Sequence, residues 1–402
     1  MDLDRFHPAG IEHSAAADSP GPSPSDRVHS LVTSLGPRSA LMVTIDGVLA
    51  TVASTVGDQL LTLGRATERD DAPDVLGSVV TDPRDFVLLN DAFSVDPLVI
   101  DIAAGATIAD PIVVIHVVSG GPDLAVFPRT VIRGGAGSVA GVIEIVVDAD
   151  AGLLAGLPSL PSRPSGRPAP STTPVRLVVP VTEVGVADDA SLSYVSVQAL
   201  GADTWQLAHQ ASMIGARATL NSFAVALGGG YARLRTDSAL HGEAGTSKLR
   251  AAFIGREDQM LDFRTLQDHL APRTTSDLLF MGAVADRSHS VYSGLIRVHR
   301  GAVRSDARQT NHNLVLDEGA HADSVPNLDI EENDVTCSHG STVGPVDEDQ
   351  RYYLESRGVE PDQAERLIIA GFFEDIADQV PIASTRSMIG QALADRTGVH
   401  GA

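Results

Sequence analysis

The sequence predicts a mainly β protein in which short strands stack into a β-solenoid, followed by a small helical domain. Short runs of β-branched and aliphatic residues recur over most of the chain, interrupted by Gly, Pro and Asp at turn positions. Small-residue pairs recur where the tight corners of a solenoid are expected. After Gly344 the apolar spacing changes from a strand period to a helical period.

The N-terminal region divides into two segments. Residues 1–38 are rich in Pro, Ser, Ala and Asp, which predicts a disordered or weakly ordered arm. Residues 39–84 alternate apolar and polar positions around Asp46-Gly47 and Gly57-Asp58, which predicts short strands and hairpins that precede the core.

Residues 85–345 are predicted to form the β-helix core. Its first strands are expected in four runs of strand formers, at Phe86–Leu89, Leu98–Ile100, Ile112–His116 and Val142–Val147. The Pro- and Ser-rich stretch Leu157–Pro174 predicts a surface loop or a hinge. Corners are expected at small-residue steps, namely Gly215-Ala216, Gly228–Gly230, Gly245-Thr246, Gly282-Ala283, Gly301-Ala302 and Gly319-Ala320. A β-sandwich is the alternative, because periodicity alone does not separate the two architectures.

Residues 346–402 are predicted to form a helical domain. One helix is expected over 347–357 with Gly358 as its stop, a second from Pro361 to before Pro381, and a third from Thr385 to about Leu393. The apolar stripe of the second helix is predicted at Ala364, Leu367, Ile368, Gly371, Phe372 and Ile376. Because one helical face cannot bury both Phe372 and Phe373, one of them is a candidate for contact with a partner.

Composition limits the function classes. Hydrophobic residues make up 43% of the chain and aromatic residues only 4%, which suits a narrow interior of modest side chains. The net charge of -23 opposes binding to nucleic acid or to anionic lipid. A single cysteine excludes an internal disulfide framework and fits a reducing compartment. Without a signal-peptide pattern or a clean apolar run, we expect a cytoplasmic protein that does not insert into a membrane.

The candidate chemistry lies at Cys337 and His339, which are two residues apart and share one face of a strand. Thiolate and imidazole together are ligands for iron or zinc. Two ligands cannot hold an iron–sulfur cluster, so a second subunit would have to supply the others. Taken singly, Cys337 also fits a small buried hydrophobe, and His339 a structural hydrogen-bonding residue.

The sequence predicts no nucleotide-binding site. Gly135–Ala140 matches a dinucleotide fingerprint as a string, but a strand pattern follows it where a helix is required, so a turn is predicted. The chain has no Gly-x-x-x-x-Gly-Lys-Ser/Thr loop, so ATP chemistry would belong to a partner.

The later part of the chain resembles the SufB/SufD family of iron–sulfur cluster assembly proteins, and within it the SufD type. The Cys-Ser-His-Gly pattern is the SufD form, and Asn311 stands where SufB-like chains carry a cysteine. The segments that carry the resemblance are Arg308–Leu316, Pro326–Ile330, Asp334–Gly340, Tyr353–Val359 and Leu367–Phe373.

The resemblance implies a right-handed parallel β-helix with a C-terminal helical domain, acting as a non-enzymatic scaffold. It implies a SufB partner joined through the β-helix and a SufC ATPase docked on the C-terminal helices. His339, with Cys337, would ligate iron or a nascent, transient cluster at the SufB interface, and the isolated chain would bind no cofactor. Flavin is associated with such complexes, but it is assigned to no residue here. The alternatives are a self-sufficient homodimeric scaffold and, from another class, a β-helix polysaccharide lyase.

Overall fold

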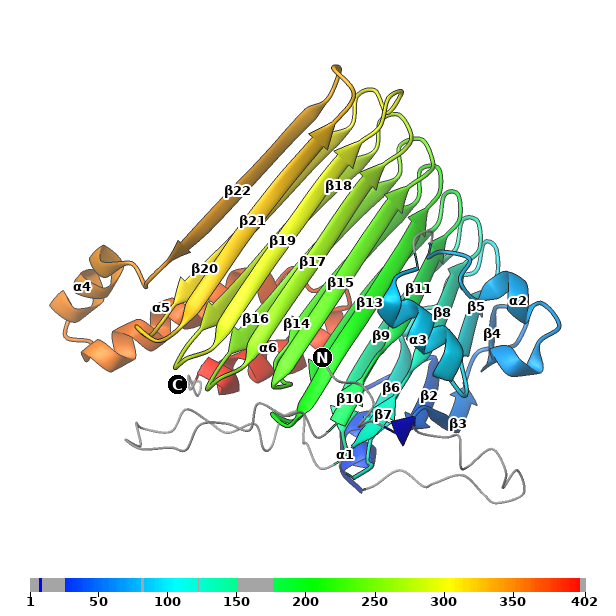
Figure 1. Ribbon diagram of the computed structural model, residues 1–402, viewed down its shortest axis with the longest axis horizontal. Helices are drawn as coiled ribbons and strands as arrows, with labels where there is room; N and C mark the ends of the chain where they lie inside the picture. Colours follow the sequence, from blue (N-terminus) through cyan, green and yellow to red (C-terminus); the bar gives the residue numbers. More distant parts are fainter. Residues whose placement is uncertain (1–6, 9–25, 81–82, 122, 150–175, 398–402) are drawn as a thin grey trace.

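Figure 1 shows the computed structural model of the chain, in which strands of two sheets stack into a parallel β-helix. The structure describes residues 7–8, 26–80, 83–121, 123–149 and 176–397. From β11 onward the chain alternates between the two sheets, and the solenoid has about 7 turns. The pairings along the stack are parallel; β2–β3 and β4–β5, at its N-terminal end, are antiparallel. The predicted solenoid with C-terminal helices is therefore confirmed.

Sheet A is ordered β21-β19-β17-β15-β13-β11-β8-β5-β4. Its strands are β4 (Leu61–Arg65), β5 (Leu98–Ile102), β8 (Arg129–Gly134), β11 (Val181–Val186), β13 (Thr204–Ile214), β15 (Tyr231–Leu240), β17 (Met260–His269), β19 (His289–Val298) and β21 (His321–Ile330). Three short strands lie off this path, namely β1 (His7–Pro8), β7 (Leu124–Val126) and β10 (Arg176–Val178).

Sheet B is ordered β22-β20-β18-β16-β14-β12-β9-β6-β2-β3. Its strands are β2 (Ala40–Ile45), β3 (Val48–Ser54), β6 (Ile112–Val118), β9 (Val139–Asp148), β12 (Ser191–Ala199), β14 (Thr219–Ala226), β16 (Thr246–Gly255), β18 (Thr275–Val284), β20 (Asp306–Val315) and β22 (Thr336–Gly344).

Aromatic rings fill the middle of the solenoid interior. Phe253, Phe263, Phe280 and Tyr292 form a continuous stack with successive ring centroids 4.5, 5.6 and 5.2 Å apart. Gly282 lies inside β18 and not at a corner as predicted, because its strand passes over this stack. A β-carbon on Gly282 would lie 2.1 Å from the Phe253 ring, so only glycine fits there.

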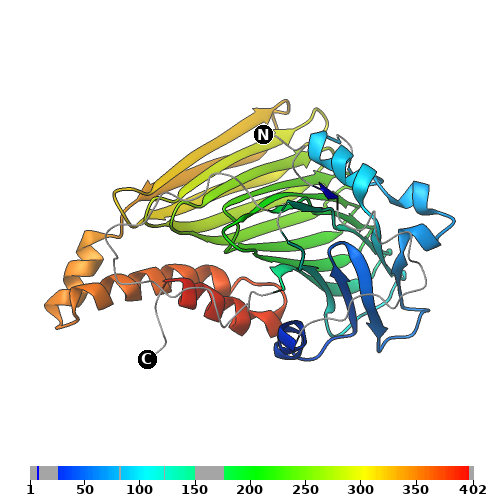
Figure 2. The same ribbon diagram turned by 60° about the horizontal axis from the view of Figure 1, so that its bottom comes forward.

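Three helices joined by short connections follow β22: α4 (Glu348–Ser356), α5 (Pro361–Ala377) and α6 (Ala383–Thr397). Figure 2 shows α5 and α6 lying along one side of the solenoid. Ile376 and Leu393 join the outward-facing Val195 and Ile254 of sheet B in one buried cluster. Burial of this apolar face, at about 25 cal/mol per Å², holds the helices on the sheet.

The predicted strand at Phe86–Leu89 is wrong, because this run belongs to helix α3 (Asp85–Phe93). Short apolar runs fit a buried strand and a buried helix equally well. Helix α3 packs on the outer face of sheet A, where Phe93 contacts Phe127 with ring centroids 5.4 Å apart. Its buried Asn90 donates to the carbonyls of Pro128 and Val179, both at 2.8 Å, so the helix also bonds to two coils of the solenoid.

The N-terminal region contains more helix than was predicted. Helix α1 (Asp26–Ser34) lies within the segment expected to be a weakly ordered arm, and it buries Leu31 against the outer face of sheet B. Between β4 and α3 lie a 3-10 turn, η2 (Ala66–Glu68), and α2 (Ala72–Val75). Strands β2 and β4 extend sheets B and A at the N-terminal end of the stack.

Gly135–Ala140 forms a turn that leads into β9, with Gly137 at a φ of 68°, so no helix follows the fingerprint-like string. The expected loop at Leu157–Pro174 and most of the expected arm lie outside the described residues. Within the described part of the chain, no helix is long and apolar enough to cross a bilayer.

Candidate functional site

The C-terminal end of the solenoid is open. Strands β21 and β22 are the last members of sheets A and B, and each pairs with a strand on one side only. Figure 1 shows both at one end of the stack. In the preceding coils the inward-facing side chains are buried, whereas most residues of β21 and β22 are exposed or half-buried. The end therefore presents free backbone groups and uncovered interior side chains.

Cys337 and His339 face the interior of the solenoid at this open end. In the parallel register Ala307 pairs with Cys337 and Gln309 with His339. Ala307 and Gln309 are buried while the residue between them is exposed, which identifies the inward face of both strands. The predicted sharing of one face is thus present, with the imidazole on the last strand of the stack.

The two candidate ligands differ in environment. The Cys337 side chain is half-buried and packs beside Val298 and Ala307. Burial, together with the nearby Asp306 carboxylate, raises the pKa of the Cys337 thiol above its usual value, so at neutral pH the free chain carries a thiol. Metal binding needs the thiolate, so a bound cation would have to offset the free energy of deprotonating the Cys337 thiol. His339 is exposed. In the described part of the chain, no third His, Cys, Asp or Glu joins the pair in a metal-binding group.

The inward face of β20, beneath the open end, carries three buried amide side chains that were not predicted. Gln309 and Asn311 stand where β18 has Leu278 and Phe280, and Asn313 pairs with Gly282. Asn313 donates to the Asn311 amide oxygen at 2.6 Å. Among the described residues, both amide atoms of the buried Gln309 and the Asn313 amide oxygen have no hydrogen-bond partner. Buried groups of this kind cost free energy unless water or a ligand satisfies them.

The helical domain leaves several large apolar side chains exposed. The buried positions of α5 are Ala364, Ile369, Phe373, Ile376 and Ala377. The predicted stripe is confirmed at Ala364 and Ile376, but Leu367 is 45% exposed, and Phe373 is buried in place of the half-buried Phe372. Helix α4 buries no residue and carries Tyr352, which is 72% exposed.

The histidines of the later strands have distinct roles. His269 is buried, and its two ring nitrogens contact the hydroxyls of Thr274 and Ser276 at 2.7 and 2.9 Å. His299 contacts Asp268 at 2.9 Å on the surface. His289, His321 and Asp323 form the single three-ligand group found among the described residues.

The buried His269 makes stability depend on pH. Burial lowers its pKa from 6.5 to about 4, so the unfolded chain takes up this proton first as the pH falls. The contribution of neutral His269 is complete above pH 6.5 and is lost between there and about pH 4. Between pH 7 and pH 5, the free energy of unfolding of the wild type should fall by about 2 kcal/mol more than that of His269→Gln. Urea titrations at both pH values measure this difference, and equal falls would contradict it.

Comparison with known proteins identifies a family. The profile of the SUF system FeS cluster assembly SufBD core domain matches residues 168–372, just over half of the chain. A SufBD family protein of Mycobacterium bovis is 33% identical over 219 residues, covering 52% of this chain and 55% of that protein. The SufD proteins of Escherichia coli and Bacillus subtilis are 32% identical over 195 residues and 30% identical over 210. These alignments cover 48% and 52% of this chain, and 46% and 48% of those proteins.

The chain thus spans about half the length of the curated relatives that it matches. The matched region runs from the central coils through the open end into α5, and so includes Cys337 and His339. On the extent of this match, the chain belongs to the SufBD family of the SUF iron–sulfur cluster assembly system.

Proposed function

We propose that this protein is a non-catalytic scaffold subunit of a cytoplasmic iron–sulfur cluster assembly complex. A SufB-like chain would cover its open end, and a SufC-like ATPase would dock on α4 and α5. The observation that carries the proposal is the uncovered last coil, with His339 and Cys337 on its inward face. The two side chains are an incomplete ligand set, which a cysteine-bearing partner could complete.

The apolar residues of the open end favour a covering protein. Leu328 and Ile330 of β21 pair with the buried Ile296 and Val298, so they face the interior, yet both are exposed. On β22, Val343 faces the same interior and is 44% exposed. A second β-helix whose last strands continue the sheets would bury these side chains and use the free backbone groups, as in β-augmentation.

In this mechanism the iron–sulfur cluster is cargo. His339 supplies a nitrogen ligand, and Cys337 supplies a sulfur ligand once it is deprotonated. The buried amides of β20 provide hydrogen-bonding groups that stabilise a charged species in the interior. Movement of the ATPase on the helices would open the interface between this chain and the SufB-like chain. The cluster would then be released, because Cys337 and His339 cannot retain it alone. The proposal assigns no flavin ligand.

A pair of charge substitutions tests the covering of the open end. Leu328→Asp with Val343→Asp places carboxylates where a partner must exclude water, and is expected to abolish recovery of the SufB-like chain in co-expression pull-downs. Val325→Asp is the matched control: Val325 is 50% exposed on the same strand but faces outward, so recovery should persist.

Recovery of the partner with the double variant at wild-type yield would overturn this assignment. If the chain purified alone elutes as a dimer that the same double variant dissociates, and if that dimer retains a cluster after reconstitution with iron and sulfide, the self-sufficient homodimeric scaffold is favoured instead.

A second experiment tests docking on the helical domain. Truncation after β22 would expose the apolar face of sheet B, so single exposed positions are sharper probes. Tyr352→Asp and Leu367→Asp are expected to reduce ATPase recovery at least about tenfold without lowering the melting temperature, because neither side chain is buried in the free chain. Leu88→Asp, on α3 at the other end of the molecule, is the control. Stoichiometric ATPase on both helical variants would refute docking there.

A further inference from the structure

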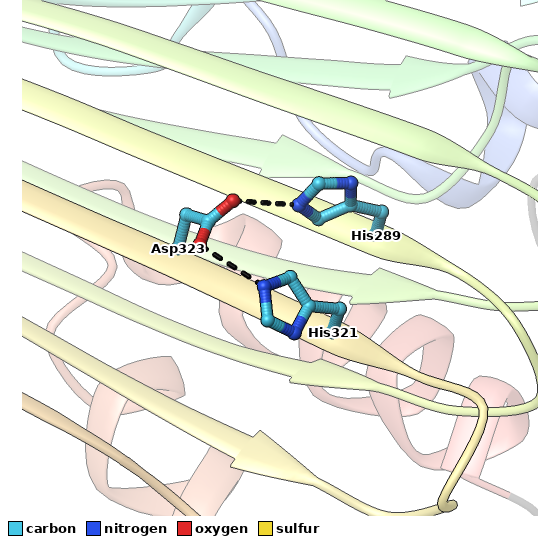
Figure 3. A group of neighbouring side chains, drawn as sticks. All are labelled: His289, His321 and Asp323. Carbon is cyan, nitrogen blue, oxygen red and sulfur yellow. Dashed lines mark hydrogen bonds and ion pairs between the residues drawn. The ribbon is translucent and has the colours of Figure 1, made fainter.

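Three potential metal ligands meet on the outer face of sheet A, on its last two strands, β19 and β21. His289 is the first residue of β19 and His321 the first of β21, and the two are direct partners in the parallel register. Asp323 lies two residues beyond His321, and therefore on the same face. Figure 3 shows both imidazoles turned toward the carboxylate between them.

The distances place all three ligand atoms around one point. His289 Nε2 lies 2.9 Å from Asp323 Oδ2, and His321 Nε2 lies 3.1 Å from Asp323 Oδ1. The ring centroids of the two histidines are 5.0 Å apart. The ligand atoms all lie within 4.8 Å of one another, so small side-chain rotations would bring them to the 2.0–2.2 Å typical of zinc–nitrogen and zinc–oxygen bonds.

The ligands also have suitable protonation chemistry. A neutral imidazole carries its proton on either nitrogen, so moving that proton to Nδ1 frees Nε2 to bind a cation. Both oxygens of the Asp323 carboxylate face the imidazoles, one toward His289 and one toward His321. Two imidazoles and one carboxylate form a ligand set used for zinc and for non-haem iron(II) with open coordination positions.

The neighbouring acidic residues of the turns have other partners. Asp286 and Asp317 accept hydrogen bonds from the backbone of Glu257 and Asp286 at 2.8 and 2.7 Å, so the site consists of its three ligands alone. Other histidines of the solenoid surface, such as His299 with Asp268, pair singly with a carboxylate. Within the described residues, the His289 group is the one place where three such ligands converge.

We propose that His289, His321 and Asp323 form a binding site for a divalent first-row transition metal, Zn²⁺ or Fe²⁺, with coordination positions open to solvent. The site is separate from Cys337 and His339, which face the interior from sheet B. It rests on its own ligands and does not depend on the proposed assembly function.

Titration of the purified full chain tests the site. After treatment with EDTA and its removal, Zn²⁺ is followed by calorimetry and Co²⁺ by its visible absorption. A variant carrying Cys337→Ala and His339→Ala removes the other candidate ligands and should retain one equivalent of metal. Adding His321→Ala, or Asp323→Asn, should weaken binding at least about tenfold, because each removes one of three protein ligands.

His299→Ala is the matched control, since it removes a half-exposed surface histidine that pairs with one aspartate. It should leave the titration unchanged. The proposal fails if the wild type binds no Zn²⁺ or Co²⁺, if His321→Ala and Asp323→Asn bind as the wild type does, or if binding disappears with Cys337→Ala and His339→Ala alone.

Discussion

Replacing Arg129 with methionine is expected to lower the free energy of unfolding by about 3–5 kcal/mol. Arg129 is 2% exposed, and its guanidinium lies 2.6 Å from the buried Glu183 carboxylate. Glu183 also accepts hydrogen bonds from the backbone of Gly77 and Val79 at 2.8 and 2.9 Å. Methionine would fill the volume but leave the carboxylate buried without its cation.

The network explains why the effect should be large. Arg129 also donates to Asn90 of α3 and pairs with Asp91, so one guanidinium joins α3, the segment after α2 and two coils of sheet A. Urea denaturation of the variant measures the loss. Arg217→Met is the control, because the pair of Arg217 with Asp189 is exposed and should contribute little. A midpoint unchanged in Arg129→Met would show that burial of this pair does not stabilise the N-terminal coils.

His339→Ala is expected to reduce cluster formation in the co-expressed complex at least about tenfold, while the complex still assembles. The reason is geometric: His339 faces inward on the last strand, where a covering chain would place its own ligands beside it. Iron and acid-labile sulfide per complex, together with visible absorption, measure cluster content. Size-exclusion chromatography shows whether assembly persists.

Two neighbouring residues of β22 serve as comparisons for this variant. Ser338→Ala changes the adjacent residue on the opposite face of β22 and should retain full cluster content. Cys337→Ala removes the half-buried sulfur, and an intermediate loss would assign it a ligand role beside His339. Equal cluster content in the wild type and His339→Ala would remove His339 from the site.

Much of the architecture could be predicted because solenoid strands are local in sequence. Strand-forming runs, turn residues and the change of period after Gly344 are each visible within a short window. The incorrect predictions lie where tertiary packing determines the local structure. Phe86–Leu89 becomes helical because α3 must cover sheet A, and Gly282 stays in a strand because the Phe253 ring lies beneath it.

The site could be predicted in part. The shared face of Cys337 and His339 follows from their spacing, and the register shows that this face is the inner one. The unpartnered amide of Gln309 and the unpartnered amide oxygen of Asn313 could not be found from sequence, because glutamine and asparagine are usually exposed. The His289 group could not be found either, since 32 residues of chain separate its two histidines while one strand spacing separates them in space.

The sequence by itself determined that this chain is mainly β with a helical tail, and that its cysteine and a histidine share one strand face. Those properties depend on residue period and composition, which act locally. Only the tertiary structure decided which coil is last, which face of β22 is inward and which residues meet across sheet A. These depend on register between distant strands, and register is set by how side chains pack between coils.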